Sequence, residues 1–276
     1  MQGIVTGEAS LAGLVDMHVH SGPDVRARKL DDIAVAREAA AAGLRAVLIK
    51  SHVTITADRA AIAESLVPGV RVFGAIALNH QVGGLNPAAV ETALALGAKE
   101  VWLPTFSASG NAGRSNGIAI ADEKGELRPI VRDIMRLVAE RDAILGTGHV
   151  SVAESVLVVR EARRMGLRKV LVTHPDNRMI GMSVETQREL AGMGALFERT
   201  YESVLTHPTL DLAGFAARIR AVGVDSTVLT SDMGQPENPT PVAGFRECIA
   251  GLLAAGITSD EVRLMAGENP SRLLGL

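Results

Sequence analysis

The chain has 276 residues, of which 47% are hydrophobic and 3% aromatic, and its formal net charge is -3 at pH 7. The length suits one domain the size of an α/β barrel, and the composition predicts a large aliphatic core. The charge balance argues against a nucleic-acid partner. The single cysteine excludes an internal disulfide and is typical of the reducing cytoplasm, where we expect the protein. We find neither a signal peptide nor an apolar run of roughly 18 residues, so no membrane span is expected.

Short apolar segments alternate with amphipathic segments of helical period along the chain. The predicted strands are 11–20, 44–52, 70–80, 100–106, 143–149, 167–174, 195–200 and 226–232. The predicted helices are 30–42, 56–66, 86–97, 129–142, 152–165, 184–193, 208–222 and 241–255, with a last short helix from Thr258.

This alternation predicts parallel strands, and eight strand–helix units predict a closed or distorted (β/α)8 TIM barrel of the α/β class. An open doubly wound sheet is the alternative, but the Gly-rich phosphate loop that it would carry is absent after the first strand. No linker divides the sequence, so we expect a single domain over residues 1–276.

One long irregular segment, 107–128, follows the fourth predicted strand and is rich in Gly, Ser and Asn. Within it, the polar turn 122–125 between 117–120 and 126–127 predicts a small β-hairpin. A loop of this length in a compact domain is usually a functional lid or a disordered segment. We therefore expect an insertion that covers the site or contacts another subunit.

Histidines gather at the ends of the predicted strands. The first strand ends in His18-Val19-His20, and the period of two places both imidazoles on one face. Asp232 ends the last strand, and six of the seven histidines end a strand, namely His18, His20, His52, His80, His149 and His174. The carboxyl ends of barrel strands form the active-site face, so this pattern predicts a metal site there.

The arrangement resembles the amidohydrolase superfamily of metal-dependent hydrolases over essentially the whole chain. That family carries His-x-His after strand one, one His after each of strands five and six, and an Asp after strand eight. The matching residues here are His18, His20, His149, His174 and Asp232. The ending 269–276 is similar to an Asn-Pro-Ala-x-Leu-Leu-Gly ending common in the family. The resemblance implies a divalent metal, with zinc as our first choice and Mn, Fe or Ni as alternatives.

The sequence departs from the family pattern on the fourth strand. Many members place a carboxylated Lys or a Glu there to bridge two metals, whereas 101–106 has neither near its end. Lys50 from strand two and Glu198 from strand seven are the candidates for such a bridge. We favour one metal per chain, with two as the alternative.

The ligand set leaves one choice open. If the metal takes His149, then His174 is free to hold the water or to stabilise the oxyanion, and if both bind, a second metal becomes feasible. A bound metal lowers the pKa of water and polarises a carbonyl or phosphoryl oxygen. Asp232 would accept the proton of the attacking water and pass it to the leaving group. We therefore place Asp232 and His174 in the catalytic set.

Cations and further histidines surround the predicted site. Arginine suits carboxylate and phosphate groups because its donors form a planar fork. The residues expected to contact substrate are Arg26, Arg28, His52, His80 and Arg178, with Arg199 as a further cation. The alternative for each of them is a solvated surface residue or a hydrogen-bonded residue at the end of a strand.

These features predict a cytoplasmic metal-dependent hydrolase. Its water would attack an amide, lactone, ester or phosphoester of a small anionic molecule. The alternative is a metal-dependent non-oxidative decarboxylase, which resembles branches of the same family, and a third reading is a barrel retained for binding or structure. The expected partner is a small-molecule substrate, and the aliphatic helix faces would permit a homo-oligomer.

Overall fold

The computed structural model describes residues 9–110 and 116–276. The predicted domain includes residues 1–8, and so does the segment in which we expect no signal peptide. These residues lie outside the described ones. Residues 111–115 belong to the predicted insertion and also lie outside them.

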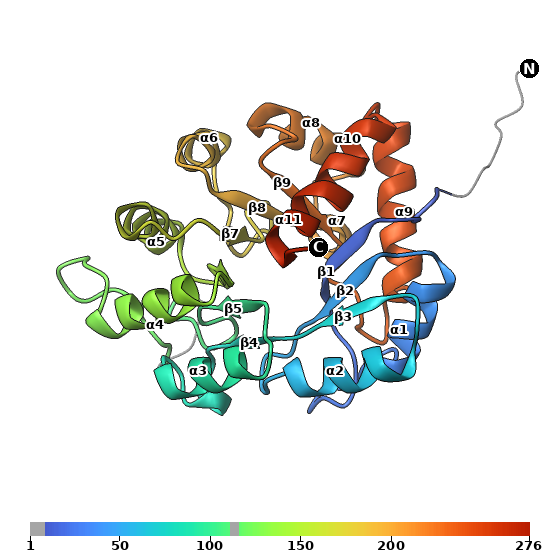
Figure 1. The fold of residues 1–276 in the computed structure, drawn as a ribbon. Coiled ribbons are helices and arrows are strands. Elements are labelled where there is room, and N and C mark those ends of the chain that lie inside the picture. Colours follow the sequence, from blue (N-terminus) through green and yellow to red (C-terminus); the bar gives the residue numbers. More distant parts are fainter. Residues whose placement is uncertain (1–8, 111–115) are drawn as a thin grey trace, which may run out of the picture.

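Parallel strands form the centre of the molecule (Figure 1). They are β1 (Val15–Val19), β2 (Ala46–Ile49), β3 (Arg71–Phe73), β4 (Ala75–Ala77), β5 (Glu100–Trp102), β6 (Ile144–Gly146), β7 (Val170–Thr173), β8 (Leu196–Thr200) and β9 (Thr227–Thr230). Their hydrogen bonds make one sheet in the order β1-β2-β3 and another in the order β4 to β9. The described chain thus has the parallel order that the sequence predicts.

One bent strand connects the two sheets, because only Gly74 separates β3 from β4. A Cβ atom on Gly74 would lie 2.4 Å from the backbone of Thr56, so only glycine lets the strand pass this close to the start of the preceding helix. At the other edge, β1 and β9 meet. The His20 N–H donates to the Met233 carbonyl (2.8 Å), and the Asp232 N–H donates to the His18 carbonyl (2.8 Å). The strands therefore follow one another around a barrel, as predicted.

Helices surround the strands (Figure 1). They are α1 (Asp32–Ala41), α2 (Ala57–Leu66), η1 (His80–Val82), α3 (Pro87–Ala95), α4 (Pro129–Glu140), α5 (Val152–Met165), α6 (Val184–Gly192), α7 (Tyr201–Thr206), α8 (Leu212–Val222), α9 (Pro241–Ala254), α10 (Ser259–Arg263), η2 (Leu264–Glu268) and α11 (Asn269–Leu274). The sequence did not predict α7. This helix ends at Thr206, and the extended backbone of the next residue, His207 (ψ 128°), is typical of a residue before proline. The predicted helix 208–222 accordingly begins later, at Leu212.

The C-terminal segment closes one end of the barrel. Leu273 and Leu274 of α11 pack into the cluster that fills the barrel interior, next to Val15 and Trp102. The Asn269 side-chain amide donates to the Thr227 carbonyl at the start of β9 (2.8 Å). The ending that resembles the family tail therefore covers the amino ends of the strands.

The insertion 107–128 follows β5 as predicted, but its hairpin is smaller than expected. A single antiparallel bridge joins Ala121 to Leu127, and the Arg128 N–H donates to the Ile120 carbonyl (2.9 Å). Ile120 and Leu127 are buried, so this turn packs onto the barrel. In the part of the chain that the structure describes, no helix has the length and apolar character needed to span a membrane.

A substitution at Gly234 tests how closely the backbone packs where β1 and β9 meet. Its φ is +133°, and an added Cβ would lie 1.9 Å from the His20 carbonyl oxygen. We predict that Gly234→Ala lowers the free energy of unfolding in urea by more than about 2 kcal/mol. The control Gly97→Ala has φ +95° and open space around its Cβ, so only the left-handed strain of about 1–2 kcal/mol applies. Equal losses in the two variants would contradict the close packing.

Candidate metal centre

An irregularity in β1 sets the direction of its two histidines. The register with β2 shifts between Asp16 and Val19, where β1 holds one residue more than its partner. Asp16 is paired with Val47, which packs on the outer side of the barrel. Regular alternation would place Asp16 on the same face as His18 and His20, but the extra residue turns only the two histidines toward the barrel mouth.

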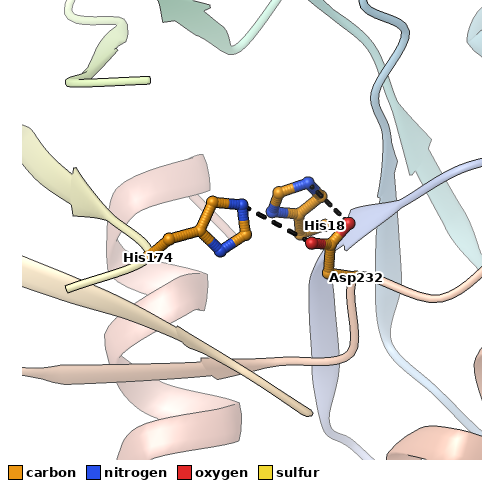
Figure 2. Close-up of side chains that lie close together, drawn as sticks. All are labelled: His18, His174 and Asp232. Atoms are coloured by element: carbon orange, nitrogen blue, oxygen red, sulfur yellow. Dashed lines mark ion pairs between the residues drawn. The ribbon is translucent and has the colours of Figure 1, made fainter. Parts of the chain in front are cut away.

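The imidazoles from β1 and β7 converge on the carboxylate that follows β9 (Figure 2). Asp232 Oδ1 lies 3.1 Å from Nε2 of His18 and 3.1 Å from Nε2 of His20. Asp232 Oδ2 lies 3.5 Å from Nε2 of His174. Donor atoms of His18, His174 and Asp232 all lie within 4.8 Å of one another, close enough to hold one ion.

Two of these residues adopt a backbone conformation that is unusual outside glycine. His174 has φ 53° and Asp232 has φ 56°, both in the left-handed region. Each residue comes just after a strand, so the left-handed turn ends the strand and directs the side chain over the barrel mouth. Such conformations cost about 1–3 kcal/mol and gather at functional sites.

A backbone carbonyl fixes the tautomer of His20. Its Nδ1 lies 3.0 Å from the Lys50 carbonyl oxygen, which can only accept a hydrogen bond. Nδ1 therefore carries the proton, and Nε2 keeps its lone pair on the side of Asp232. This arrangement is typical of metal-ligating histidines.

Alternate residues of β8 orient the other two imidazoles. Glu198 Oε1 lies 3.1 Å from Nδ1 of His18, and Thr200 Oγ1 lies 3.2 Å from Nδ1 of His174. The period of two along the strand puts both oxygens on the interior face. In each of the three histidines, Nδ1 therefore meets an oxygen atom while Nε2 faces Asp232.

The donor set fits a divalent metal. Both ring nitrogens of His18 are buried and make no hydrogen bond of acceptable angle among the described residues, although each lies 3.1 Å from a carboxylate oxygen. Imidazole nitrogens with a carboxylate suit Zn, Mn, Fe and Ni. A cation among the Nε2 atoms and Asp232 would satisfy the lone pairs that the protein leaves unused.

The protonation states also suit a metal site. Burial raises the pKa of Asp232, but His18 and the other imidazoles outweigh it and hold that pKa well below its usual range. Burial lowers the pKa of His20 to about 4 and that of His174 to about 3, despite the opposing effect of Asp232. Burial also opposes a charge on His18, yet Asp232 and Glu198 raise its pKa to about 9. A proton on His18 thus balances the carboxylates in the metal-free chain.

His149 stands apart from the converging group. Its ring centre lies 5.3 Å from that of His174, and both of its buried ring nitrogens have no hydrogen-bond partner among the described residues. Burial holds the pKa of His149 well below its usual value, so the ring is neutral. The geometry therefore favours His174 with His18 and Asp232, and leaves His149 free.

A cavity of about 240 Å³ opens over these groups. It is lined by His18, His20, Arg26, Arg28, His52, Phe106, His149, His174, Asn177, Met179, Glu202, Asp232 and Gln235. Three of the residues expected to contact substrate, Arg26, Arg28 and His52, are therefore on its wall.

His80 and Arg178 do not line the cavity. The chain turns into η1 at His80, whose Nε2 lies 2.9 Å from the Asn116 carbonyl oxygen instead. Arg178 is exposed, and the cavity is lined by the residues on either side of it. Arg199 faces away from the barrel interior because it alternates with Glu198 and Thr200, and it forms a buried ion pair with Asp176.

The two candidate bridging residues lie deeper in the barrel. Lys50 Nζ lies 4.5 Å from the centre of the Trp102 ring and has no hydrogen-bond partner among the described residues. Glu198 contacts the nitrogen of His18 opposite the one that faces Asp232. From this position the Glu198 carboxylate orients the His18 ring. It does not suit a ligand that bridges two metals at Asp232.

The sequence reading missed several residues of the cavity wall, of which Glu202 is the most informative. It lies in α7, two residues beyond β8, and accepts a hydrogen bond from the Asn177 amide (3.3 Å). Burial, with a smaller effect of Asp232, raises the pKa of Glu202 to about 7. The sequence does show Glu202 as an acid just after a predicted strand. The direction of its side chain, however, is set by α7, which the sequence did not predict.

Comparisons with known proteins give a family and a fold. Residues 13–198 match a family described as being of unknown function, DUF6282. No curated protein matched the chain.

Solved structures with the same fold include enzymes of several kinds. An amidohydrolase from Pseudomonas aeruginosa has a TM-score of 0.62 at 14% identity, over 95% of each chain. A 2,6-dihydroxybenzoate decarboxylase from Rhizobium has a TM-score of 0.61 at 12% identity, over 96% of this chain and 99% of that one. An N-acetylglucosamine-6-phosphate deacetylase from Thermotoga maritima has a TM-score of 0.59 at 13% identity, over 96% of this chain and 78% of that one. These likenesses confirm the barrel fold.

Metal content distinguishes the two candidate histidines. We predict that His174→Ala loses most of the bound metal, because its Nε2 faces Asp232, and that His149→Ala keeps about one metal per chain. Elemental analysis of both purified variants measures this. Loss of metal in His149→Ala with retention in His174→Ala would reverse the assignment.

The oxygen atoms on β8 are tested by Glu198→Leu and Thr200→Val. Each change removes the group facing Nδ1 of one imidazole, so we predict a metal affinity weaker by about 10- to 100-fold in a chelator competition. Thr206→Val, at an exposed position of α7, is the control and should bind metal like the unchanged chain. Unchanged affinity in both test variants would remove the orienting role.

Proposed function

The chain belongs to a family of unknown function, DUF6282, and we propose that this protein is a metal-dependent hydrolase that acts on a small anionic molecule. One observation carries the proposal: the Nε2 atoms of three buried histidines face one ionised carboxylate, while their Nδ1 atoms meet other oxygens. We propose His18, His20, His174 and Asp232 as the ligands of a single metal, with zinc as the first choice.

The proposed chemistry divides between the metal and the chain. A divalent metal supplies a lowered pKa for water and polarises a carbonyl or phosphoryl oxygen. Asp232 is ionised and lines the cavity, so it would accept the proton of the attacking water and pass it to the leaving group. His149 is neutral and lines the cavity, and its two ring nitrogens have no hydrogen-bond partner among the described residues, so its N–H would donate to the developing oxyanion.

The cavity limits the substrate. Its volume of about 240 Å³ is smaller than the roughly 300–1,000 Å³ of pockets for drug-sized ligands, which supports a small molecule. Arg26 and Arg28 on its wall support an anionic one. An amide, lactone, ester or phosphoester is the bond we propose. We also propose a single domain and a cytoplasmic location. The proposed partner is a small-molecule substrate, and neither nucleic acid nor a membrane. A homo-oligomer is compatible with this function.

A non-oxidative decarboxylase is the second candidate. The fold is shared with the 2,6-dihydroxybenzoate decarboxylase, and arginines on the wall of the same cavity would bind a carboxylate substrate. The two reactions differ in their products, since hydrolysis releases acid or amine and decarboxylation releases CO₂.

The test is a screen of the chain loaded with Zn or Mn against amides, lactones, esters, phosphoesters and aromatic carboxylates. We predict metal-dependent acid release that a chelator abolishes, and a loss of about 10²- to 10⁴-fold in Asp232→Asn, the range of a lost proton-transfer group. Asp58→Asn, an exposed residue of α2, is the control and should keep full activity. CO₂ release would favour the decarboxylase. Turnover that survives both chelation and Asp232→Asn would contradict the metal site.

A further inference from the structure

The arginines beside the cavity differ in their partners. Arg28 donates from Nε and Nη2 to Asp24 Oδ2 at 2.9 and 2.8 Å, and the two side chains are only 6% and 2% exposed. Asp24 Oδ1 also accepts from the backbone N–H of Arg26 (3.3 Å). The charge of Arg28 is therefore used within the loop, where it holds the backbone that carries Arg26.

Arg26 has a different partner. Its guanidinium lies 4.1 Å from the centre of the Phe106 ring, and no ion pair joins it to a carboxylate among the described residues. Stacking on an aromatic face sets the plane of the guanidinium and leaves its N–H donors at the edge. Arg26 thus lines the cavity as a cation placed over Phe106, with no carboxylate partner among residues 9–110 and 116–276.

A column of stacked rings leads from Arg26 to the metal centre. Phe106 stacks on His52 with ring centres 3.7 Å apart, and His52 stacks on His20 at 4.9 Å. Two rings therefore separate Arg26 from a proposed metal ligand. A second hollow of about 120 Å³ is lined by the same Arg26, His52 and Phe106. A group bound to Arg26 would lie at the end of the site remote from the metal.

The loop that presents Arg26 is anchored at its base. Arg59 Nε donates to Asp32 Oδ2 at 2.6 Å, and Arg59 Nη2 donates to the Ser21 carbonyl at 2.9 Å. The backbone N–H of Lys29 donates to the Gly234 carbonyl (2.9 Å), next to the site. Less ordering is required on binding when the recognition residue is held in advance.

We infer that the substrate carries a carboxylate remote from the bond attacked, and that Arg26 is the residue that recognises it. This inference rests on the proposed function and specifies its substrate class. The guanidinium of Arg26, which forms no ion pair in the described part of the chain, matches a single negative charge. Glu202 and Asp232 also line the cavity and would repel two negative charges held together on one group at Arg26, so a carboxylate fits better there than a phosphate monoester.

The test measures binding of glutarate, glutaramide and inorganic phosphate by calorimetry to the metal-loaded full-length chain. Glutaramide replaces both carboxylates by neutral amides of nearly the same shape. Arg26→Met keeps an aliphatic stem on Phe106 but removes the charge. Arg178→Met removes an exposed arginine outside the cavity and is the control. Metal content is measured in each variant, so that attraction of carboxylate to the metal cancels in the comparison.

We expect the unchanged chain and Arg178→Met to prefer glutarate over glutaramide. In Arg26→Met, glutarate should bind about 10- to 100-fold more weakly, as for a lost charged hydrogen bond, with glutaramide unchanged. Equal glutarate affinity in the unchanged chain and Arg26→Met, or no preference for glutarate in the unchanged chain, would overturn the inference. An Arg26-dependent preference for phosphate over glutarate would overturn the choice of carboxylate.

This readout separates the inference from the proposed function because it needs no turnover. A chain that hydrolyses nothing in the screen but binds glutarate through Arg26 would refute the hydrolase and keep the carboxylate site. A metal-dependent hydrolase whose glutarate affinity ignores Arg26 would refute the inference alone.

Discussion

Two carboxylates flank one buried imidazole, and this constraint organises the mouth of the barrel. Asp232 and Glu198 each lie 3.1 Å from a nitrogen of His18, on opposite sides of the ring. Buried like charges are costly unless a positive charge balances them. In the metal-free chain the raised pKa of His18 supplies that charge as a proton. A divalent cation bound to Asp232 would supply more positive charge than one proton. This explains why the neutral imidazoles of His20 and His174 also face Asp232.

The fold supports this constraint from several directions. The extra residue in β1 turns His18 and His20 inward, and left-handed turns direct His174 and Asp232 over the strands. The cavity lies on the face where the carboxyl ends of the strands meet, and α11 covers the opposite end of the barrel. On that face the loop after β1 supplies the cations Arg26 and Arg28, and Phe106 after β5 supplies an aromatic part of the cavity wall. The metal side and the substrate side therefore come from segments that are far apart in the sequence.

Much of this arrangement could be predicted, because it follows from periodicity. Eight repeats of strand and helix predict the barrel, and strand-end positions predict that the histidines and Asp232 share one face. The choice between His149 and His174 could not be predicted, since it depends on the left-handed turns after β6 and β7, at Gly148 and His174. Likewise, the sequence shows Arg26 and Arg28 near each other, but only three-dimensional contacts distinguish the one paired with Asp24 from the one stacked on Phe106. Glu202 escaped notice because its position depends on a short helix that the periodicity does not indicate.

Anomalous diffraction from a crystal of the zinc-loaded chain would locate the metal directly. We predict one peak, about 2.0–2.2 Å from the Nε2 atoms and from an Asp232 oxygen. The nitrogen ligands would be His18, His20 and His174. A peak bound by His149 in place of His174, a second peak beside Lys50 or Glu198, or no peak in the zinc-loaded crystal would contradict it.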